Sequence, residues 1–196
     1  MRNLRSASTL LLIWLAAGCA MPFDGGGSEE RKALGVDMQE AAVQADSIMQ
    51  KTLKAVSPEL RWNHGPSIDS RCRDVPGTGS VKRRIAVMTV VSRERRGSLL
   101  GVVERNWRSR GYQITSVRAS EELPAMYAST PEGFRMRVAV AGEGQFFFSI
   151  TTPCFAESDV ADPRTPPNTP HREGGYPQRP DIHDDFWSAP SPPPRT

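Results

Sequence analysis

Proline is distributed unevenly along the chain, and its distribution limits which part can fold. Eleven of the 17 prolines lie between residues 153 and 194, where aliphatic residues are few. A proline-rich segment with little apolar surface cannot offset the conformational entropy that folding removes. The sequence therefore predicts a disordered tail over residues 155–196. The folded domain is confined to residues 34–154, about 120 residues, which is enough for one hydrophobic core.

Two segments of that domain have the apolar spacing of an α-helix, with apolar side chains three and four residues apart. The first begins at Asp37, whose carboxylate can cap free backbone amides, and ends before Pro58. The second spans Glu94–Arg110, and Gly111 follows where helices commonly take a left-handed residue. We expect both apolar stripes to pack against a sheet.

The remaining apolar segments are short and predict strands. Ile85–Val91 is almost continuously apolar and rich in β-branched residues, as in a central strand. Residues 134–140 and 145–152 alternate with a period of two around a glycine-rich turn, which predicts a β-hairpin. Two shorter candidates are Leu60–Trp62 and Tyr112–Val117. The order of these elements predicts a single α+β domain, in which two helices pack against a mostly antiparallel sheet of about five strands.

The first 18 residues have the order of an export signal. Arg2 and Arg5 precede eight consecutive apolar residues, Leu10–Ala17, and small residues follow. Eight residues at a helical rise of about 1.5 Å extend only about 12 Å, well short of the roughly 30 Å hydrocarbon core of a bilayer. The segment therefore predicts a signal over residues 1–18 and not a membrane-spanning helix.

The signal is followed by a cysteine, and the junction reads Ala16-Ala17-Gly18-Cys19. This motif resembles the lipobox of bacterial lipoproteins, although Ala16 stands where the lipobox commonly has Leu. The resemblance implies that Cys19 is diacylated and becomes the mature N-terminus, anchored in the cell membrane at its extracytoplasmic face. Residues 19–33 would then be the lipidated cysteine and a flexible, glycine-rich tether. An ordinary cleaved signal peptide and a chance apolar start are the alternatives.

Arginine outnumbers lysine by 21 to 4. Together with the lipobox, this bias resembles small lipoproteins of streptomycete-type actinobacteria. Lipidation of Cys19 would leave Cys72 and Cys154 as a pair in an oxidising compartment. We therefore expect a disulfide bond that closes a loop of about 80 residues and stabilises the fold by roughly 4 kcal/mol in the chain-entropy model. The alternative is a reactive thiol or metal ligand, but no neighbouring cysteine or histidine has metal-binding spacing.

Basic residues are concentrated in one stretch of the chain. Loss of Arg2 and Arg5 with the signal leaves 23 basic and 22 acidic side chains, so net charge gives no argument for nucleic-acid binding. Between residues 81 and 118, however, ten residues are basic and two are acidic. Such a face could contact anionic lipid headgroups or anionic wall polymer. The candidate contacts are Lys82, Arg83, Arg84, Arg95, Arg105 and Arg108. An ordinary solvated face in an arginine-rich proteome is the alternative.

Side chains suited to catalysis are sparse. His64 is the one histidine of the predicted domain, and no Gly-x-Ser-x-Gly turn accompanies it. The pairs of adjacent carboxylates lie in predicted loops, where nothing raises a pKa. No metal site and no cofactor is predicted. An envelope hydrolase or other enzyme with a pocket near His64 is the alternative to a protein without catalytic activity.

The function that these patterns favour is a membrane-anchored, extracytoplasmic binding or interaction module of the cell envelope. Its partners would be the membrane, through the lipid, and an anionic lipid, a wall polymer or another envelope protein; nucleic acid is not expected. The pair Phe186-Trp187, flanked by acidic residues and proline in the predicted tail, is a candidate docking element. An unused terminus is the alternative for this pair.

Overall fold

A computed structural model describes residues 35–170, 172, 175–176 and 179–190. Its two helices lie close to where the sequence predicts them. Helix α2 (Met38–Leu53) begins after Asp37, whose carboxylate accepts a hydrogen bond from the Glu40 amide at 2.9 Å. Helix α3 (Arg93–Ser109) is followed by Gly111, which has a φ of 75°. A left-handed residue at this position favours glycine and ends the helix.

The described strands form one antiparallel sheet. In chain order they are β1 (Trp62–His64), β2 (Ile68–Arg71), β3 (Thr78–Val87), β4 (Gln113–Arg118), β5 (Ala125–Ser129), β6 (Arg135–Val140), β7 (Phe146–Thr151) and β8 (Phe155–Ala156). They lie side by side in the order β1-β3-β7-β6-β5-β4, and β2 and β8 pair with the first half of β3. The predicted fold class is confirmed: a single α+β domain with an antiparallel sheet packed by two helices.

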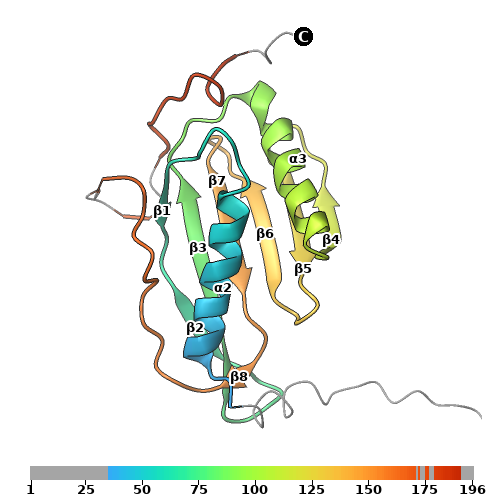
Figure 1. Ribbon diagram of the computed structural model, residues 1–196, viewed down its shortest axis with the longest axis vertical. Coiled ribbons are helices and arrows are strands. Elements are labelled where there is room, and N and C mark those ends of the chain that lie inside the picture. Colours follow the sequence, from blue (N-terminus) through green and yellow to red (C-terminus); the bar gives the residue numbers. More distant parts are fainter. Residues whose placement is uncertain (1–34, 171, 173–174, 177–178, 191–196) are drawn as a thin grey trace, which may run out of the picture.

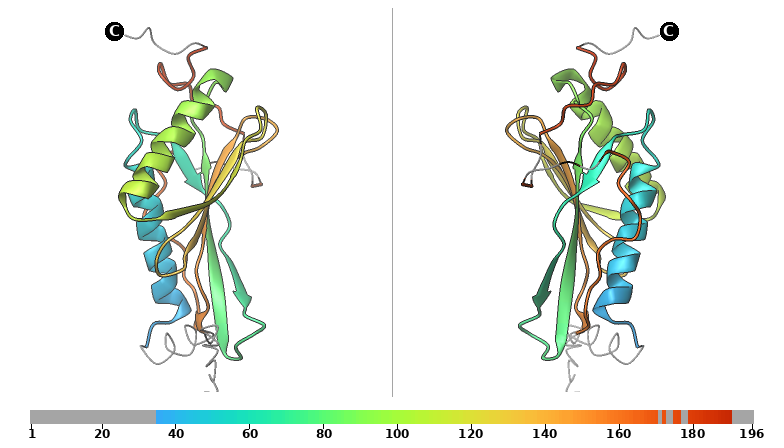
Figure 2. Two further views of the ribbon diagram at one scale, coloured as in Figure 1. Left: turned by 90° about the vertical axis from the view of Figure 1, so that its right-hand side faces the viewer. Right: turned by 90° about the vertical axis from the view of Figure 1, so that its left-hand side faces the viewer.

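Both helices cover the same face of the sheet (Figures 1 and 2). Every second strand residue points toward the helices and forms the core. In β7 these residues are Phe146, Phe148 and Ile150, all of them buried. Trp107 of α3 joins the helices, because its indole N–H donates a hydrogen bond to the Thr52 hydroxyl of α2 at 3.0 Å. The opposite face of the sheet carries no helix of the described chain (Figure 2). We call it the helix-free face.

The sheet has more strands than the roughly five that the sequence predicts. Strand β5 is not predicted because Pro124 precedes it and its apolar pattern is weak; it forms because β4 and β6 pair with it on both sides. All four residues of β2 are exposed, so it has no apolar alternation to reveal it. Backbone pairing with β3 defines β2 and the two-residue β8. Pairing by hydrogen bonds along a neighbouring strand leaves little trace in a sequence.

The prediction of a disordered tail from residue 155 is wrong for the residues that the structure describes. Phe155 and Ala156 form β8, and the following chain runs along the domain beside β1 (Figure 1). The Ala161 amide donates a hydrogen bond to the Gln39 side chain of α2 at 2.6 Å. The Asn168 side chain accepts a hydrogen bond from the Trp62 amide at 2.7 Å and donates one to the Leu60 carbonyl at 2.9 Å. These bonds satisfy a backbone group at the start of β1 and one just before it, as a neighbouring strand would. We call the described residues between 157 and 190 the strap.

The end of the strap contributes to the core. Trp187 is only 1% exposed, and its indole N–H donates a hydrogen bond to the Pro58 carbonyl at 2.7 Å. Phe186 lies edge-on to Trp187, with the ring centroids 4.9 Å apart. The predicted docking element is therefore an internal contact of the domain. Composition alone is misleading for this segment, because a few aromatic and polar side chains hold the strap although most of its residues are not apolar.

The predicted disulfide bond joins Cys72 and Cys154, whose Cα atoms are 6.2 Å apart. Cys72 directly follows β2, and Cys154 lies between β7 and β8. The predicted signal (residues 1–18), Cys19 and the tether (residues 19–33) lie outside the described residues. Within the described part of the chain, no helix is both long enough and apolar enough to cross a membrane.

Candidate functional site

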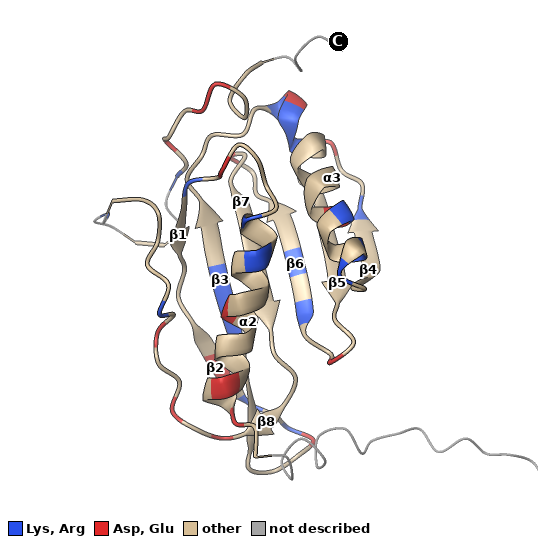
Figure 3. Cartoon of the chain, viewed as in Figure 1, with Lys and Arg blue, Asp and Glu red and all other residues tan. Residues whose placement is uncertain are grey.

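The six cations predicted to form one anionic contact lie in three different places. Lys82, Arg83 and Arg84 are consecutive on β3, so their side chains alternate between the two faces of the sheet. Arg105 and Arg108 are exposed on α3. Figure 3 shows basic positions on β3, β6 and α3. Arg108 there donates hydrogen bonds to the Glu104 carboxylate on the same helix. The predicted set is therefore not one surface.

Two of the six, Arg83 and Arg95, are buried, so the prediction that they contact an anionic surface is wrong. Arg83 is 2% exposed; its guanidinium lies 3.3 Å from the Asp46 carboxylate and donates to the Ala161 carbonyl at 2.7 Å. The Arg95 guanidinium lies 4.2 Å from the centroid of the Phe186 ring. A buried charge requires such partners. Both arginines thus hold parts of the strap against the domain.

The helix-free face brings together Lys82, Arg84 and two arginines of β6 that the prediction did not include. On β7, Ser149 pairs with Arg84 on one side and Arg137 on the other. Two residues further along β7, Thr151 pairs in the same way with cations of β3 and β6. Each hydroxyl thus lies between two cations whose Cα atoms are about 10 Å apart. The two sets are the Arg84 row (Arg84, Ser149, Arg137) and the Lys82 row (Lys82, Thr151, Arg135).

A pocket of about 400 Å³ opens on this face over the Arg84 row. Phe147, the next residue of β7 on the same face, and Tyr176 of the strap contribute aromatic surface, with ring centroids 6.0 Å apart. Tyr176 also lies against Gly65, where any side chain would collide with the tyrosine ring. The pocket is lined by Lys82, Arg84, Arg137, Phe147, Phe148, Ser149 and Tyr176.

The electrostatics of this pocket favour an anion. None of the four cations in the two rows forms an ion pair with a carboxylate of the described chain. Burial lowers the pKa of the Lys82 ammonium, and the three arginines of the two rows lower that pKa further. The Nε of Arg137 is buried without a hydrogen-bond partner among the described residues. A bound anion would offset this repulsion and supply hydrogen-bond acceptors.

The alternation of residues in the sequence could have identified Arg135 and Arg137 as members of this face, although a count of charges along the chain does not. Both alternate with apolar residues in the predicted hairpin, so a core on one side places the two arginines on the other. Joining that pattern to the basic residues of β3 requires the pairing order of the strands, which one sequence does not reveal. No sequence feature identifies Tyr176 as a site residue, because the composition of the strap predicts disorder.

His64, the candidate catalytic residue, holds the strap. Its Nε2 lies 2.7 Å from the Thr165 carbonyl, and its ring stacks edge-on against Trp62 with centroids 5.0 Å apart. Burial raises the pKa of the nearby Asp46 carboxyl, while Arg83 and His64 act in the opposite direction. His64 does not line the pocket over the Arg84 row. This geometry gives the histidine a packing role.

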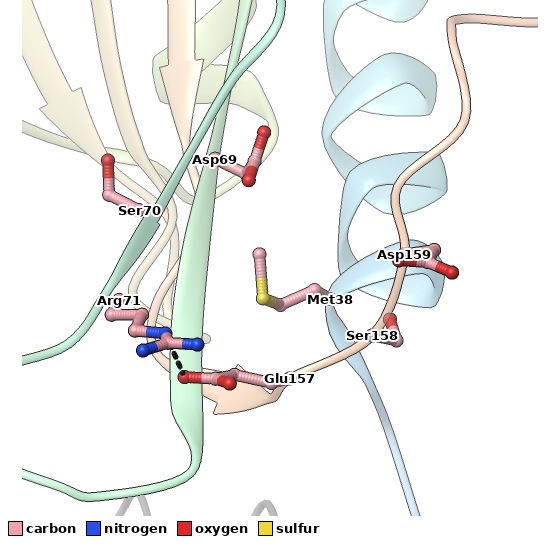
Figure 4. A pocket seen from close by; sticks show the side chains of 7 residues that line it. All are labelled: Met38, Asp69, Ser70, Arg71, Glu157, Ser158 and Asp159. Atoms are coloured by element: carbon pink, nitrogen blue, oxygen red, sulfur yellow. Dashed lines mark ion pairs between the residues drawn. The ribbon is translucent and has the colours of Figure 1, made fainter.

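A second pocket, of about 480 Å³, lies where α2, β2 and the strap meet (Figure 4). Arg71 and Glu157 form an ion pair across it at 3.3 Å, but the Arg71 side chain is 87% exposed, so water screens the pair. The Ser158 hydroxyl accepts a hydrogen bond from the Gln39 amide at 3.1 Å. The described residues contain no cluster of three or more side chains suited to holding a metal ion. The helix-free face is therefore the stronger candidate site.

No protein-family model and no curated protein matches the sequence. A solved structure of a DUF4853 family protein from Actinomyces odontolyticus is similar to this chain, with a TM-score of 0.40 and 9% sequence identity. The similarity covers 63% of this chain and 71% of that protein. A likeness of this size says nothing about a ligand or an activity.

Proposed function

We propose that the chain is a lipid-anchored protein of the extracytoplasmic face of the cell membrane, and that it binds an anionic partner on the helix-free face of its sheet. The motif ending in Cys19 supports the anchor. The disulfide bond between Cys72 and Cys154 supports an oxidising compartment. The binding role rests on one observation, the two rows of cations without a carboxylate partner in the described chain.

The rows suit binding because they are held by the sheet itself. Their Cα positions are fixed by the register of three neighbouring strands, so little ordering of the backbone is needed when an anion binds. Each row offers positive charge from both sides and a hydroxyl between them, which is the donor set that phosphate and carboxylate groups accept from. Anchoring at the membrane would keep this face among the anionic polymers and lipids of the envelope.

The anchor is tested by metabolic labelling. Cells that express the full chain receive an alkyne-bearing fatty acid, and the exported protein is examined for incorporation. We expect label on the wild-type chain and none on the Cys19→Ala variant, which should also leave the membrane fraction. Equal labelling of both chains, or no labelling of the wild type, contradicts the anchor.

The binding face is tested with two variants that remove the same charge from different surfaces. Arg84→Gln/Arg137→Gln alters the helix-free face, while Arg105→Gln/Arg108→Gln alters the exposed side of α3. The full chain, purified in detergent, is titrated with polyphosphate and with uncharged dextran. Hydrogen bonds to charged groups contribute about 1.5–3 kcal/mol each, so the first variant should lose at least tenfold in affinity for polyphosphate. The second should bind like the wild type. An equal loss in both variants would show that only net charge matters.

A further inference from the structure

The two cationic rows repeat along the strands, and the repeat distance carries information about the ligand. Arg84 and Lys82 are two residues apart on β3, as are Ser149 and Thr151 on β7. Strand residues rise about 3.3 Å each, so the centres of the two rows are roughly 7 Å apart. Each row has the same composition, with a hydroxyl between two cations. A ligand with a single anionic group would occupy one row and leave the other unused.

We infer that this face binds a phosphodiester chain of the wall-polymer kind, in which successive phosphates joined by a short polyol occupy the two rows. A three-carbon polyol places six single bonds of about 1.5 Å between neighbouring phosphorus atoms. Because bond angles make an extended chain zigzag, each bond advances only about 1.2 Å, so the phosphorus atoms are roughly 7 Å apart. That distance equals the spacing of the rows. This inference rests on the proposed function, because it specifies the anion that the helix-free face takes.

The shape of the site favours a polymer chain over the surface of a membrane. Tyr176 and Phe147 stand beside the Arg84 row, and Lys82, Arg84 and Arg137 are partly buried within the pocket, whereas Arg135 is exposed outside it. A flat layer of lipid headgroups would meet the rim of such a hollow before it reached the three cations inside it. A single chain that runs parallel to β3 and β7 can enter the hollow. Its carbon atoms on the far side of the Arg84 row from the Lys82 row would lie against the aromatic rings.

The inference is tested by calorimetry with glycerol phosphate oligomers that carry one, two or four phosphates. The full chain, purified in detergent, is titrated with each oligomer, with inorganic phosphate and with a tetramer of galacturonic acid. The Cys19→Ala chain, which lacks the lipid, is titrated in detergent-free buffer with the two-phosphate oligomer and with vesicles that contain phosphatidylglycerol. We expect the two-phosphate oligomer to bind at least tenfold more tightly than the one-phosphate compound. The four-phosphate oligomer should bind at least as tightly as the two-phosphate oligomer. Galacturonate and the vesicles should bind at least tenfold more weakly than the two-phosphate oligomer.

Row variants separate the two phosphate positions. Lys82→Gln/Arg135→Gln removes one row and Arg84→Gln/Arg137→Gln the other, with Arg105→Gln/Arg108→Gln as the charge-matched control. Each row variant should abolish the advantage of two phosphates over one, while the control keeps it. Circular dichroism and thermal unfolding of every variant identify any that fail to fold, and for such a pair the single variants replace the double.

The outcomes distinguish this inference from the proposed function. Two results would overturn the phosphodiester inference while anions still bind at the rows. One is that the one-phosphate compound binds as tightly as the two-phosphate oligomer, and the other is that galacturonate or the vesicles do. In both cases the anion-binding face stands. If no anion binds, or only the α3 control loses binding, both are overturned.

Discussion

Replacing Trp187 with alanine is the sharpest test of whether the strap belongs to the folded domain. The side chain is 1% exposed, belongs to the main hydrophobic core cluster, and donates a hydrogen bond to the Pro58 carbonyl. If the C-terminal region were disordered, as its composition predicts, this substitution would alter stability by less than about 0.5 kcal/mol, as at other exposed positions. The structure predicts a much larger effect.

The magnitude follows from the area that the side chain buries. A buried tryptophan removes about 150–250 Å² from water, which at about 25 cal/mol per Å² corresponds to about 4–6 kcal/mol. Residual contacts in the unfolded chain reduce that value, and comparable truncations cost about 3–5 kcal/mol. We therefore expect Trp187→Ala to lower the free energy of unfolding by about 4 kcal/mol. In a domain of this size the midpoint of thermal unfolding should fall by about 8–16 °C.

Urea denaturation followed by circular dichroism measures this change, and two further variants interpret it. Trp187→Phe keeps a ring but leaves the Pro58 carbonyl without its donor, so its cost should be smaller, about 1–3 kcal/mol. His183→Ala alters an exposed residue of the same segment and should cost less than about 0.5 kcal/mol. Trp187→Ala and His183→Ala variants of equal stability would refute the account of the strap.

Three other substitutions test separate contacts. Cys72→Ser/Cys154→Ser opens a loop of 82 residues, and calorimetry should show a loss of about 2–4 kcal/mol; an unchanged midpoint would mean that the bond contributes nothing. Burial raises the pKa of Asp46 above its ordinary 3.8, so the folded chain binds this proton more readily than the unfolded chain. Wild type should therefore gain stability relative to Asp46→Asn as pH falls toward 3.8 in urea titrations, and a constant or opposite difference contradicts this. Thr52→Val leaves the buried Trp107 indole N–H without its acceptor, which should cost about 1–3 kcal/mol in urea denaturation, whereas a neutral result would show that water or another group replaces the hydroxyl.

The fold was predictable from the sequence where side-chain periodicity and backbone pairing agree. Helix α2 has both an apolar stripe and a capping aspartate, and the β6–β7 hairpin alternates on both strands. Strand β2 and the strap form without such patterns. The backbone of β2 pairs with β3, and the Asn168 side chain of the strap forms hydrogen bonds with the backbone of Trp62 and Leu60 that no local rule anticipates. The conformation of β2 and of the strap therefore depends on hydrogen-bond partners that are distant in the sequence.

The candidate site was predictable only in part, for the same reason. The excess of basic residues pointed to the right region, but strand alternation separates Arg83 from its neighbours Lys82 and Arg84, and tertiary packing buries Arg95. The site is completed by β6, about 50 residues further along the chain. Which cations share a face depends on the order of the strands, and a count of charges along the sequence contains no information on that order.

Nuclear magnetic resonance mapping of the bound ligand tests the central claim most directly. The ¹⁵N-labelled full chain in detergent is titrated with the four-phosphate glycerol phosphate oligomer, and the amide and arginine side-chain signals are followed. We expect the largest shifts in the two rows, at Lys82, Arg84, Arg135, Arg137, Ser149 and Thr151, with α3 unchanged. Shifts centred on Arg105 and Arg108, or spread evenly over all cations, would contradict binding at the helix-free face.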